Sequence, residues 1–284
     1  MVYITLSIIQ STLIFVIFKL FSRFKIDNLQ AITINYLVAC LFGILITGAD
    51  RLILEAPSYN WFYFAIVLGV FFIFVFNIFA LSSQKAGVAL TSVASKMSVV
   101  LPVILGIILY HEMVNALKIT GVITALLAFY LTLKKPGNTG VKYKFFYLLI
   151  LIFIGNGIVD SLMKYTQHYY VTDNLIQFLT MVFFTSFILG GIVLTVKMSI
   201  TKRSVEFKNI LAGIILGLIN FGSTYTLFKA LSFYESSIVF PVANAGIVSL
   251  STLTGFFIFK EKLTLVNWGG IILSLIAILI IAFA

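Results

Sequence analysis

The chain has 284 residues, of which 61% are hydrophobic and only 10% charged, and its formal net charge is +10. A water-soluble domain carries charge on about a quarter of its residues, so a soluble globular protein is excluded and most of the surface must face lipid. The Lys and Arg residues are scattered through short gaps between apolar runs, which excludes a continuous basic face for nucleic acid and is typical of membrane proteins.

Two features of the chain restrict its processing and its metal chemistry. Cys40 is the single cysteine, so an intrachain disulfide framework and a multi-cysteine metal site are both excluded. Met1 leads directly into an apolar run, with no basic residue before Lys19. Because a secretory signal peptide begins with basic residues and ends at a small-residue cleavage site, we expect this first run to be retained as a membrane helix.

Ten apolar runs reach the length of about 20 residues that a helix needs to cross the hydrocarbon core of a bilayer. In chain order they are Val2–Phe21, Leu29–Gly48, Trp61–Leu81, Val88–Tyr110, Val114–Leu133, Phe145–Tyr165, Leu175–Val196, Ile210–Leu231, Ser237–Phe259 and Leu265–Phe283. They lack the alternation of a membrane β-barrel strand. The sequence therefore predicts an all-α integral membrane protein with ten transmembrane helices.

The basic residues between these runs predict the orientation of the chain. Fourteen Lys and Arg residues fall in or beside the connections that follow odd-numbered helices, and four fall on the opposite side. Connections rich in Lys and Arg remain in the cytoplasm. We therefore expect both termini outside, in a cell inner membrane.

An internal repeat links the two halves of the chain. The segment from Val88 to Leu133 aligns without gaps on Ser237 to Ala282, at an offset of 149 residues. The most informative matches in this alignment are Gly106 with Gly255, Glu112 with Glu261, and Gly121 with Gly270. We expect two five-helix repeats, at residues 1–135 and 145–284, joined by a linker at 136–144. Because five is odd, the second repeat is inverted in the membrane, which is a signature of secondary transporters with a substrate site at mid-membrane.

The repeated motifs resemble those of a known family. They are Ala80-Leu81-Ser82, Pro102, Tyr110-His111-Glu112 and Gly121 in the first half, and Ala230-Leu231-Ser232, Pro241, Phe259-Lys260-Glu261-Lys262-Leu263-Thr264 and Gly269-Gly270 in the second. With them the chain resembles the EamA-type, ten-helix branch of the drug/metabolite transporter superfamily. It departs from that branch in its first helix, where Gln10-Ser11 replaces a Trp-Gly pair, with Lys19 following. The resemblance implies transport of a metabolite, often by efflux.

Lys96 and Asp160 are the charges that lie deep within predicted helices. Ionisable groups at this depth are costly and mark functional sites by default. Three interpretations compete: the two residues form a structural ion pair, Lys96 binds an anionic group of the substrate, or Asp160 carries a proton that drives transport. The remaining alternative is that one of the two side chains snorkels to the membrane surface and has little role.

Uncharged polar residues form stripes along several of the predicted helices, including those that carry Lys96 and Asp160. We expect the substrate to be bound by Lys96 and Asp160 together with Asn156, Asn220, Asn244, Ser95, Gln10 and Asn77. The alternative is that such residues let helices approach closely and share interhelical hydrogen bonds. Ser95 and Asn244 are equivalent positions in the repeat.

These features favour a secondary transporter that exports a small metabolite, such as an amino acid or an organic anion, by alternating access. Its partners would be that small molecule, a proton as candidate coupling ion, and the lipid bilayer. A flippase for a lipid-linked intermediate is the alternative. A polytopic membrane enzyme is less favoured, since His111 and His168 both lie at helix ends without a catalytic or metal-binding constellation. No cofactor, metal or nucleic acid is expected.

Overall fold

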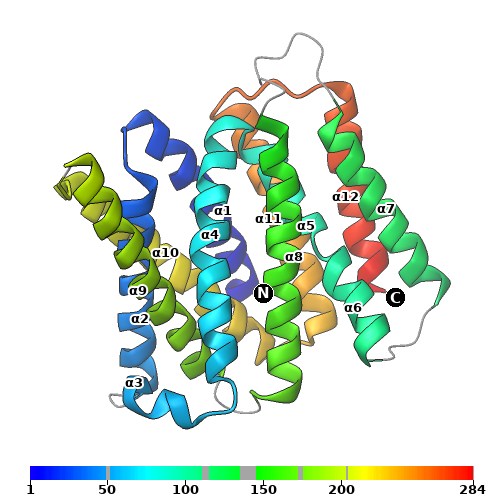
Figure 1. Ribbon diagram of the computed structural model, residues 1–284. Coiled ribbons are helices and arrows are strands. Elements are labelled where there is room, and N and C mark those ends of the chain that lie inside the picture. Colours follow the sequence, from blue (N-terminus) through cyan, green and yellow to red (C-terminus); the bar gives the residue numbers. More distant parts are fainter. Residues whose placement is uncertain (49–51, 111–114, 135–144, 172–174, 203, 284) are drawn as a thin grey trace. The chain divides into compact units, whose positions relative to one another are not determined.

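The computed structural model describes residues 1–48, 52–110, 115–134, 145–171, 175–202 and 204–283 (Figure 1). Within these ranges the chain is helical and contains no strand. The elements are α1 (Val2–Arg23), α2 (Asn28–Thr47), α3 (Leu52–Glu55), η1 (Ala56–Ser58), α4 (Phe62–Lys85), α5 (Val88–Met97), α6 (Val100–Tyr110), α7 (Ala116–Leu133), α8 (Phe146–Tyr169), α9 (Leu175–Thr201), α10 (Phe207–Leu231), α11 (Ser236–Phe257) and α12 (Leu265–Ala282).

The described ranges contain ten helical spans that are long and apolar enough to cross a membrane, with α5 and α6 together forming one of them. Each of the ten expected runs coincides with one span, so the predicted all-α class and the multi-pass membrane character are confirmed. The short elements α3 and η1 were not expected, and the predicted linker 136–144 lies outside the described residues.

The polypeptide forms two compact units, each of which combines segments from both halves of the sequence. The first unit comprises Met1–Leu20, Ile78–Ile158 and Gly222–Ala284, and the second comprises Phe21–Asn77 and Val159–Phe221. The helices α1, α4, α8 and α10 each contribute residues to both units.

In the first unit, α7 and α12 pack closely along their lengths and run antiparallel (Figure 1). Asn267 near the start of α12 donates to the backbone oxygen of Thr132 near the end of α7, at 3.2 Å. At Gly270 a Cβ atom would lie 3.0 Å from backbone atoms of α7, and at Gly121 it would meet the side chain of Ile281 at 2.7 Å. The two glycines therefore make reciprocal contacts: an offset of 149 residues carries Gly121 onto Gly270 and Thr132 onto Ile281.

In the second unit, α2 and α9 pack antiparallel in the same reciprocal way. Gly43 of α2 lies against Thr180 of α9, and Gly190 of α9 lies against Thr33 of α2. An offset of 147 residues carries one contact onto the other. Small residues let membrane helices approach to backbone distance, which is where dispersion contacts become numerous.

The adjacent residues Gly269 and Gly270 provide a matched pair for testing this packing. A Cβ at Gly270 would lie against the backbone of α7, whereas a Cβ at Gly269 would meet nothing within 4 Å. Gly270→Ala should therefore destabilise the protein by about 1–3 kcal/mol, as overpacking does. Gly269→Ala should leave stability unchanged or raise it by up to about 1 kcal/mol through helix propensity. Thermal unfolding in detergent measures both, and equal melting temperatures would contradict the close approach of α7 and α12.

A polar cluster in the second unit joins the α1–α2 connection to α9 and α10. Lys197 donates to the carboxylate of Asp27 at 2.6 Å, and the Gln30 N–H donates to the same carboxylate at 3.1 Å. The buried Asn209 donates to the side-chain oxygen of Gln30 at 2.7 Å and accepts from the Asp27 N–H at 3.1 Å. Three of these four contacts, all except the local one from Gln30 N–H to Asp27, link segments at least 170 residues apart, so the cluster stabilises the end of this unit.

The cluster makes stability depend on pH through Asp27. Burial by itself would raise the pKa of the Asp27 carboxyl, but the hydrogen bond from Lys197, the Gln30 N–H and the Lys197 charge together lower that pKa below its ordinary value. At pH values above the ordinary Asp pKa of about 3.9, the ionised Asp27 carboxylate stabilises the fold. This contribution to stability is lost as the pH falls through the lowered pKa of Asp27 in the folded state.

Asp27→Asn should lower the melting temperature at pH 7 and lose less stability than wild type on acidification. Glu206→Gln, which removes a carboxylate of an exposed pair with Lys208, serves as control; parallel pH profiles for wild type and Asp27→Asn would contradict this role.

Candidate functional site

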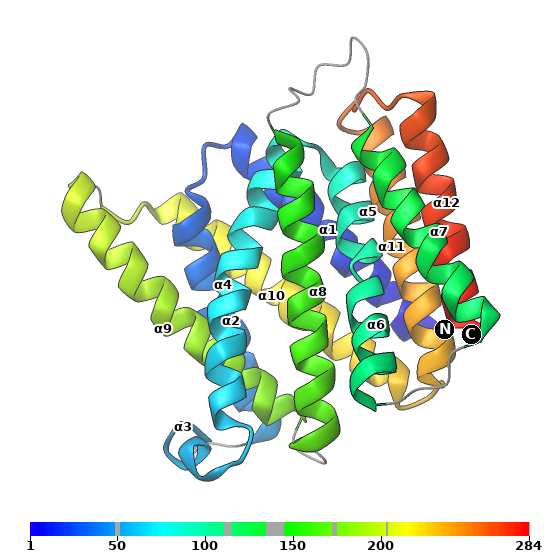
Figure 2. The same cartoon turned by 45° about the vertical axis from the view of Figure 1, so that its right-hand side comes forward.

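The fourth membrane span is interrupted near its middle, close to Pro102, where the sequence favours a simple kink. The helix α5 ends at Met97 and α6 begins at Val100, so two helices follow one another within one span (Figure 2). Pro102 lacks an N–H group and cannot bond the carbonyl of Ser98 four residues earlier. That carbonyl instead accepts from the Leu101 N–H at 2.9 Å. Ser98 keeps right-handed helical dihedrals, with φ −58° and ψ −17°, so the interruption is a tight turn at which the hydrogen-bond pattern of the helix changes.

An asparagine from α8 compensates for this break. The side-chain nitrogen of Asn156 lies 2.6 Å from Ser95 Oγ and 3.5 Å from the Ser95 carbonyl oxygen. At the next residue, Gly157, a Cβ would overlap the side chain of Leu101, so α8 approaches the break without an intervening side chain. The structure therefore brings together Ser95 and Asn156, two of the residues expected to bind substrate.

Lys96 follows Ser95 in the last turn of α5 and is half-buried. Its sequence neighbours Ser92, Ser95 and Met97 are buried. Asp160 lies one helical turn beyond Asn156 on α8 and is exposed. Lys96 belongs to the first unit and Asp160 to the second. Their pairing therefore stays a prediction.

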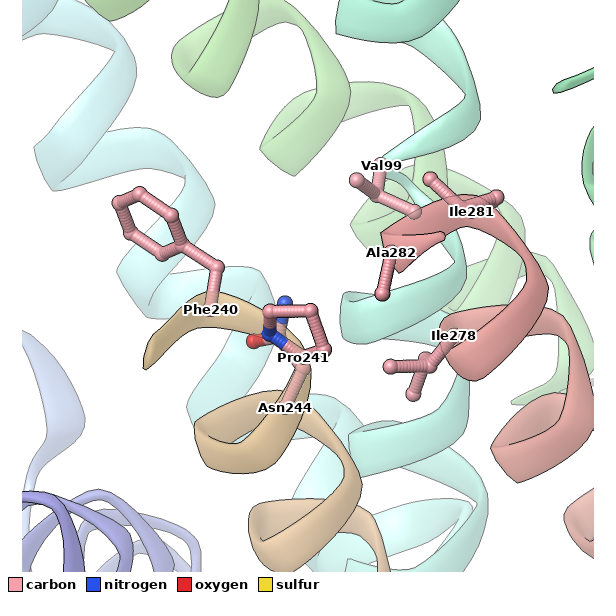
Figure 3. Close-up of a pocket in the computed structure, with 7 residues that line it drawn as sticks. All are labelled: Val99, Phe240, Pro241, Asn244, Ile278, Ile281 and Ala282. Atoms are coloured by element: carbon pink, nitrogen blue, oxygen red, sulfur yellow. The ribbon is translucent and has the colours of Figure 1, made fainter. Parts of the chain in front are cut away.

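A pocket of about 260 Å³ opens beside the break in the first unit (Figure 3). Its wall consists of Val99 at the break, Phe240, Pro241 and Asn244 of α11, and Ile278, Ile281 and Ala282 of α12. The amide of Asn244 lies beside the Pro241 ring, among otherwise apolar side chains (Figure 3). An amide both donates and accepts hydrogen bonds, so this pocket offers one polar contact within an apolar wall.

The remaining predicted residues make contacts between helices or within one helix. In the first unit, the side-chain oxygen of Gln10 accepts from Thr226 at 2.9 Å. In the second unit, Asn220 donates to the side-chain oxygen of Asn35 at 3.1 Å, and Asn77 donates to the Ile73 carbonyl of its own helix at 2.8 Å. These bonds are the interhelical and local contacts that the sequence left open as the alternative to substrate binding.

Asn35 is a polar residue that the sequence analysis missed. It is fully buried, and its side-chain nitrogen has no hydrogen-bond partner among the described residues. The motif Gly213-x-x-x-Gly217 was an available signal, because small residues four apart let membrane helices pack closely. At Gly217 a Cβ would lie 2.8 Å from the Asn35 carbonyl oxygen, so α10 does approach α2 at this point.

The part of the chain that the structure describes contains no group of three His, Cys, Asp or Glu residues that could hold a metal ion. His111 and Glu112 of the predicted loop motif lie outside the described residues.

Comparison with known proteins finds a bacterial relative that matches nearly the full length of the chain. No family model matches the chain. A Haemophilus influenzae protein, named only as an uncharacterized protein, is 31% identical over 281 residues, which cover 96% of this chain and 94% of the relative. Identity at this level along nearly the full length of both chains shows common descent, and the chain belongs to the same family as this H. influenzae protein.

Proposed function

We propose that the protein is a secondary transporter that exports a small metabolite, such as an amino acid or an organic anion, by alternating access. The observation that carries this proposal is the interruption of the fourth span directly after the residues Lys96 and Met97. Discontinuous helices with polar groups at the break are a recurring feature of substrate sites in secondary transporters. A lysine at such a break suits an anionic group such as a carboxylate, which it binds as a point charge.

The reciprocal helix contacts support an inverted repeat. In a pair related by a two-fold axis, a contact between residues i and j recurs between their equivalents. The Gly121–Ile281 and Gly270–Thr132 contacts have this relation in one unit, and Gly43–Thr180 and Gly190–Thr33 have it in the other. An axis in the membrane plane would make equivalent helices antiparallel, as α7 and α12 are and as α2 and α9 are.

The repeat, the interrupted span and the motifs together favour membership in the EamA-type branch of the drug/metabolite transporter superfamily. In this proposal, residues 1–135 and 145–284 are the two inverted repeats. The substrate crosses the membrane as the protein alternates between two conformations, in which the two repeats exchange roles. The excess of Lys and Arg in the connections after odd-numbered spans favours a cell inner membrane location with both termini outside.

A flippase for a lipid-linked intermediate is the second candidate, and the pocket at Asn244 favours it. An amphiphile needs an apolar groove with few polar contacts, and this pocket has an apolar wall with one amide. The soluble-substrate proposal relies instead on Lys96 and Asn156.

Reconstituted liposomes distinguish the two functions. A thermal-shift screen of amino acids, nucleobases and organic anions would first identify solutes that stabilise the purified protein, since a ligand that binds only the folded state raises its stability. Efflux of those solutes from proteoliposomes, compared with protein-free liposomes, tests transport. A parallel lipid-scrambling assay tests flipping. Scrambling without solute efflux would reject the metabolite transporter in favour of the flippase.

A further inference from the structure

The N-terminus of α5 has no capping side chain in its own sequence. Its N-cap residue is Gly87, which adopts a φ of +108° and carries no side chain. The first N–H groups of a helix have no intrahelical acceptor and are commonly bound by Ser, Thr, Asp or Asn at the N-cap. The N–H groups of Val88 and Ala89 therefore need an acceptor from another part of the first unit.

Glu261, in the connection between α11 and α12, supplies that acceptor. Its Oε1 atom accepts from the Val88 N–H at 2.7 Å, and its Oε2 atom accepts from the Ala89 N–H at 3.1 Å. Only 11% of the Glu261 side chain is exposed. A carboxylate at a helix N-terminus is also favoured by the helix dipole. The acidic residue of the repeated loop motif thus caps a helix more than 170 residues earlier in the chain.

Two glycines and a lysine surround the Glu261 carboxylate. A Cβ at Gly87 would lie 2.8 Å from Oε2, and a Cβ at Gly255 would lie 2.6 Å from the same atom. Lys19 of α1 places its Nζ 3.4 Å from Oε1 and 3.5 Å from the carbonyl oxygen of Gln84 in α4. The carboxylate therefore contacts α1 and α5 at once, while two glycines leave room for it.

The short helix α5 connects this cap to the break. Its ten residues span about 15 Å at 1.5 Å per residue. Glu261 binds its N-terminus, and Asn156 binds Ser95 in its last turn. Because α6 does not continue α5, these contacts at its ends help to set where α5 lies. A shift at its N-terminus is passed along a rigid helix to Lys96.

We propose that Glu261 is a positioning residue for transport: by binding the N-terminus of α5 it sets the place of Lys96, and it does not itself touch the substrate. The role of Lys96 in this inference rests on the proposed function. The capping of α5 and the placement of Lys96 can be measured without any transported solute.

The first test measures the position of α5 directly. In Glu261→Gln, amide hydrogen exchange at Val88 and Ala89 should accelerate by about tenfold or more, because one capping acceptor is replaced by an N–H₂ donor. The NMR signal of ¹³C-methylated Lys96, assigned from its loss in Lys96→Arg, should shift. Gly255→Ala retains the Glu261 charge but displaces the carboxylate, and it should change both signals in the same direction.

The matched control is Glu206→Gln, which neutralises an exposed carboxylate that pairs with Lys208. It should leave the exchange at Val88 and Ala89 and the Lys96 signal unchanged. An unaltered Lys96 signal in both Glu261→Gln and Gly255→Ala would overturn the proposal, whether or not the protein transports a solute.

The second test is a double-mutant cycle on transport rate. Glu261 binds the N-terminus of α5 at Val88, and Lys96 lies eight residues further along the helix, about 12 Å away at 1.5 Å per residue, so the two substitutions should have additive effects if each acts alone. We expect Glu261→Gln to reduce transport by about tenfold in the wild-type background. It should add little to Lys96→Ala, because the first change displaces the Lys96 ammonium group and the second has already removed it. Additive losses would overturn the positioning role. Absence of any transport by the wild type would reject the proposed function, while exchange and the Lys96 signal would still decide the role of Glu261.

Discussion

Replacing Lys96 by alanine should reduce substrate transport by between about tenfold and 100-fold, which is the range expected when a hydrogen bond to a charged group worth 1.5–3 kcal/mol is lost. Lys96 lies in the last turn of α5, one residue after Ser95 and one residue before Met97, at which the helix ends. An ionisable group at this depth in a membrane span marks a functional site by default, and the proposed function assigns the Lys96 ammonium group to an anionic group of the substrate. Efflux from proteoliposomes measures the loss.

Two controls separate a lost substrate contact from a lost fold. The Lys96→Ala protein should insert, purify as a monodisperse species and melt cooperatively. Lys208→Ala removes an exposed lysine that pairs with Glu206 and should transport at the wild-type rate. If Lys96→Ala transports normally, Lys96 has no part in substrate binding and the proposed site is wrong.

Replacing Asn156 by leucine should also reduce transport strongly, by about tenfold, which is equivalent to about 1.4 kcal/mol. The Asn156 amide is the side chain from another helix that bonds to Ser95 beside the break, at 2.6 Å from Oγ. Leucine is similar in size but cannot donate, so the end of α5 loses this contact and Lys96 loses its fixed position. The cost in stability should be smaller, about 0.6–1.7 kcal/mol, as measured for interhelical hydrogen bonds in membranes.

The matched control for Asn156→Leu is Gln167→Leu, which removes an exposed amide from the same helix α8. It should leave transport and amide exchange around Ser98 unchanged, whereas Asn156→Leu should accelerate that exchange. Wild-type transport by Asn156→Leu would show that the amide only packs against α5.

Several features followed from the sequence because they depend on local composition. A run of about 20 apolar residues has few alternatives to a membrane helix, since lipid offers its backbone no hydrogen-bond partners. The repeat offset of 149 residues carries the bounds of α7, Ala116–Leu133, onto those of α12, Leu265–Ala282. Asn156 and Ser95 were both recognised as candidates because polar residues within apolar spans are few.

Other features depended on contacts between segments far apart in the chain, and only the tertiary structure decided them. Pro102 was visible in the sequence, but the hydrogen bonds that Ser95 accepts from Ser98 and from Asn156 of α8 appear only in the packed structure. Asn35 was missed because one asparagine in an apolar run shows no partner until α10 is packed against it. Composition and periodicity thus determined which segments enter the membrane, since each segment meets the same lipid. Which polar groups meet there was decided by packing, because a hydrogen bond requires two groups within about 3 Å whatever their separation in sequence.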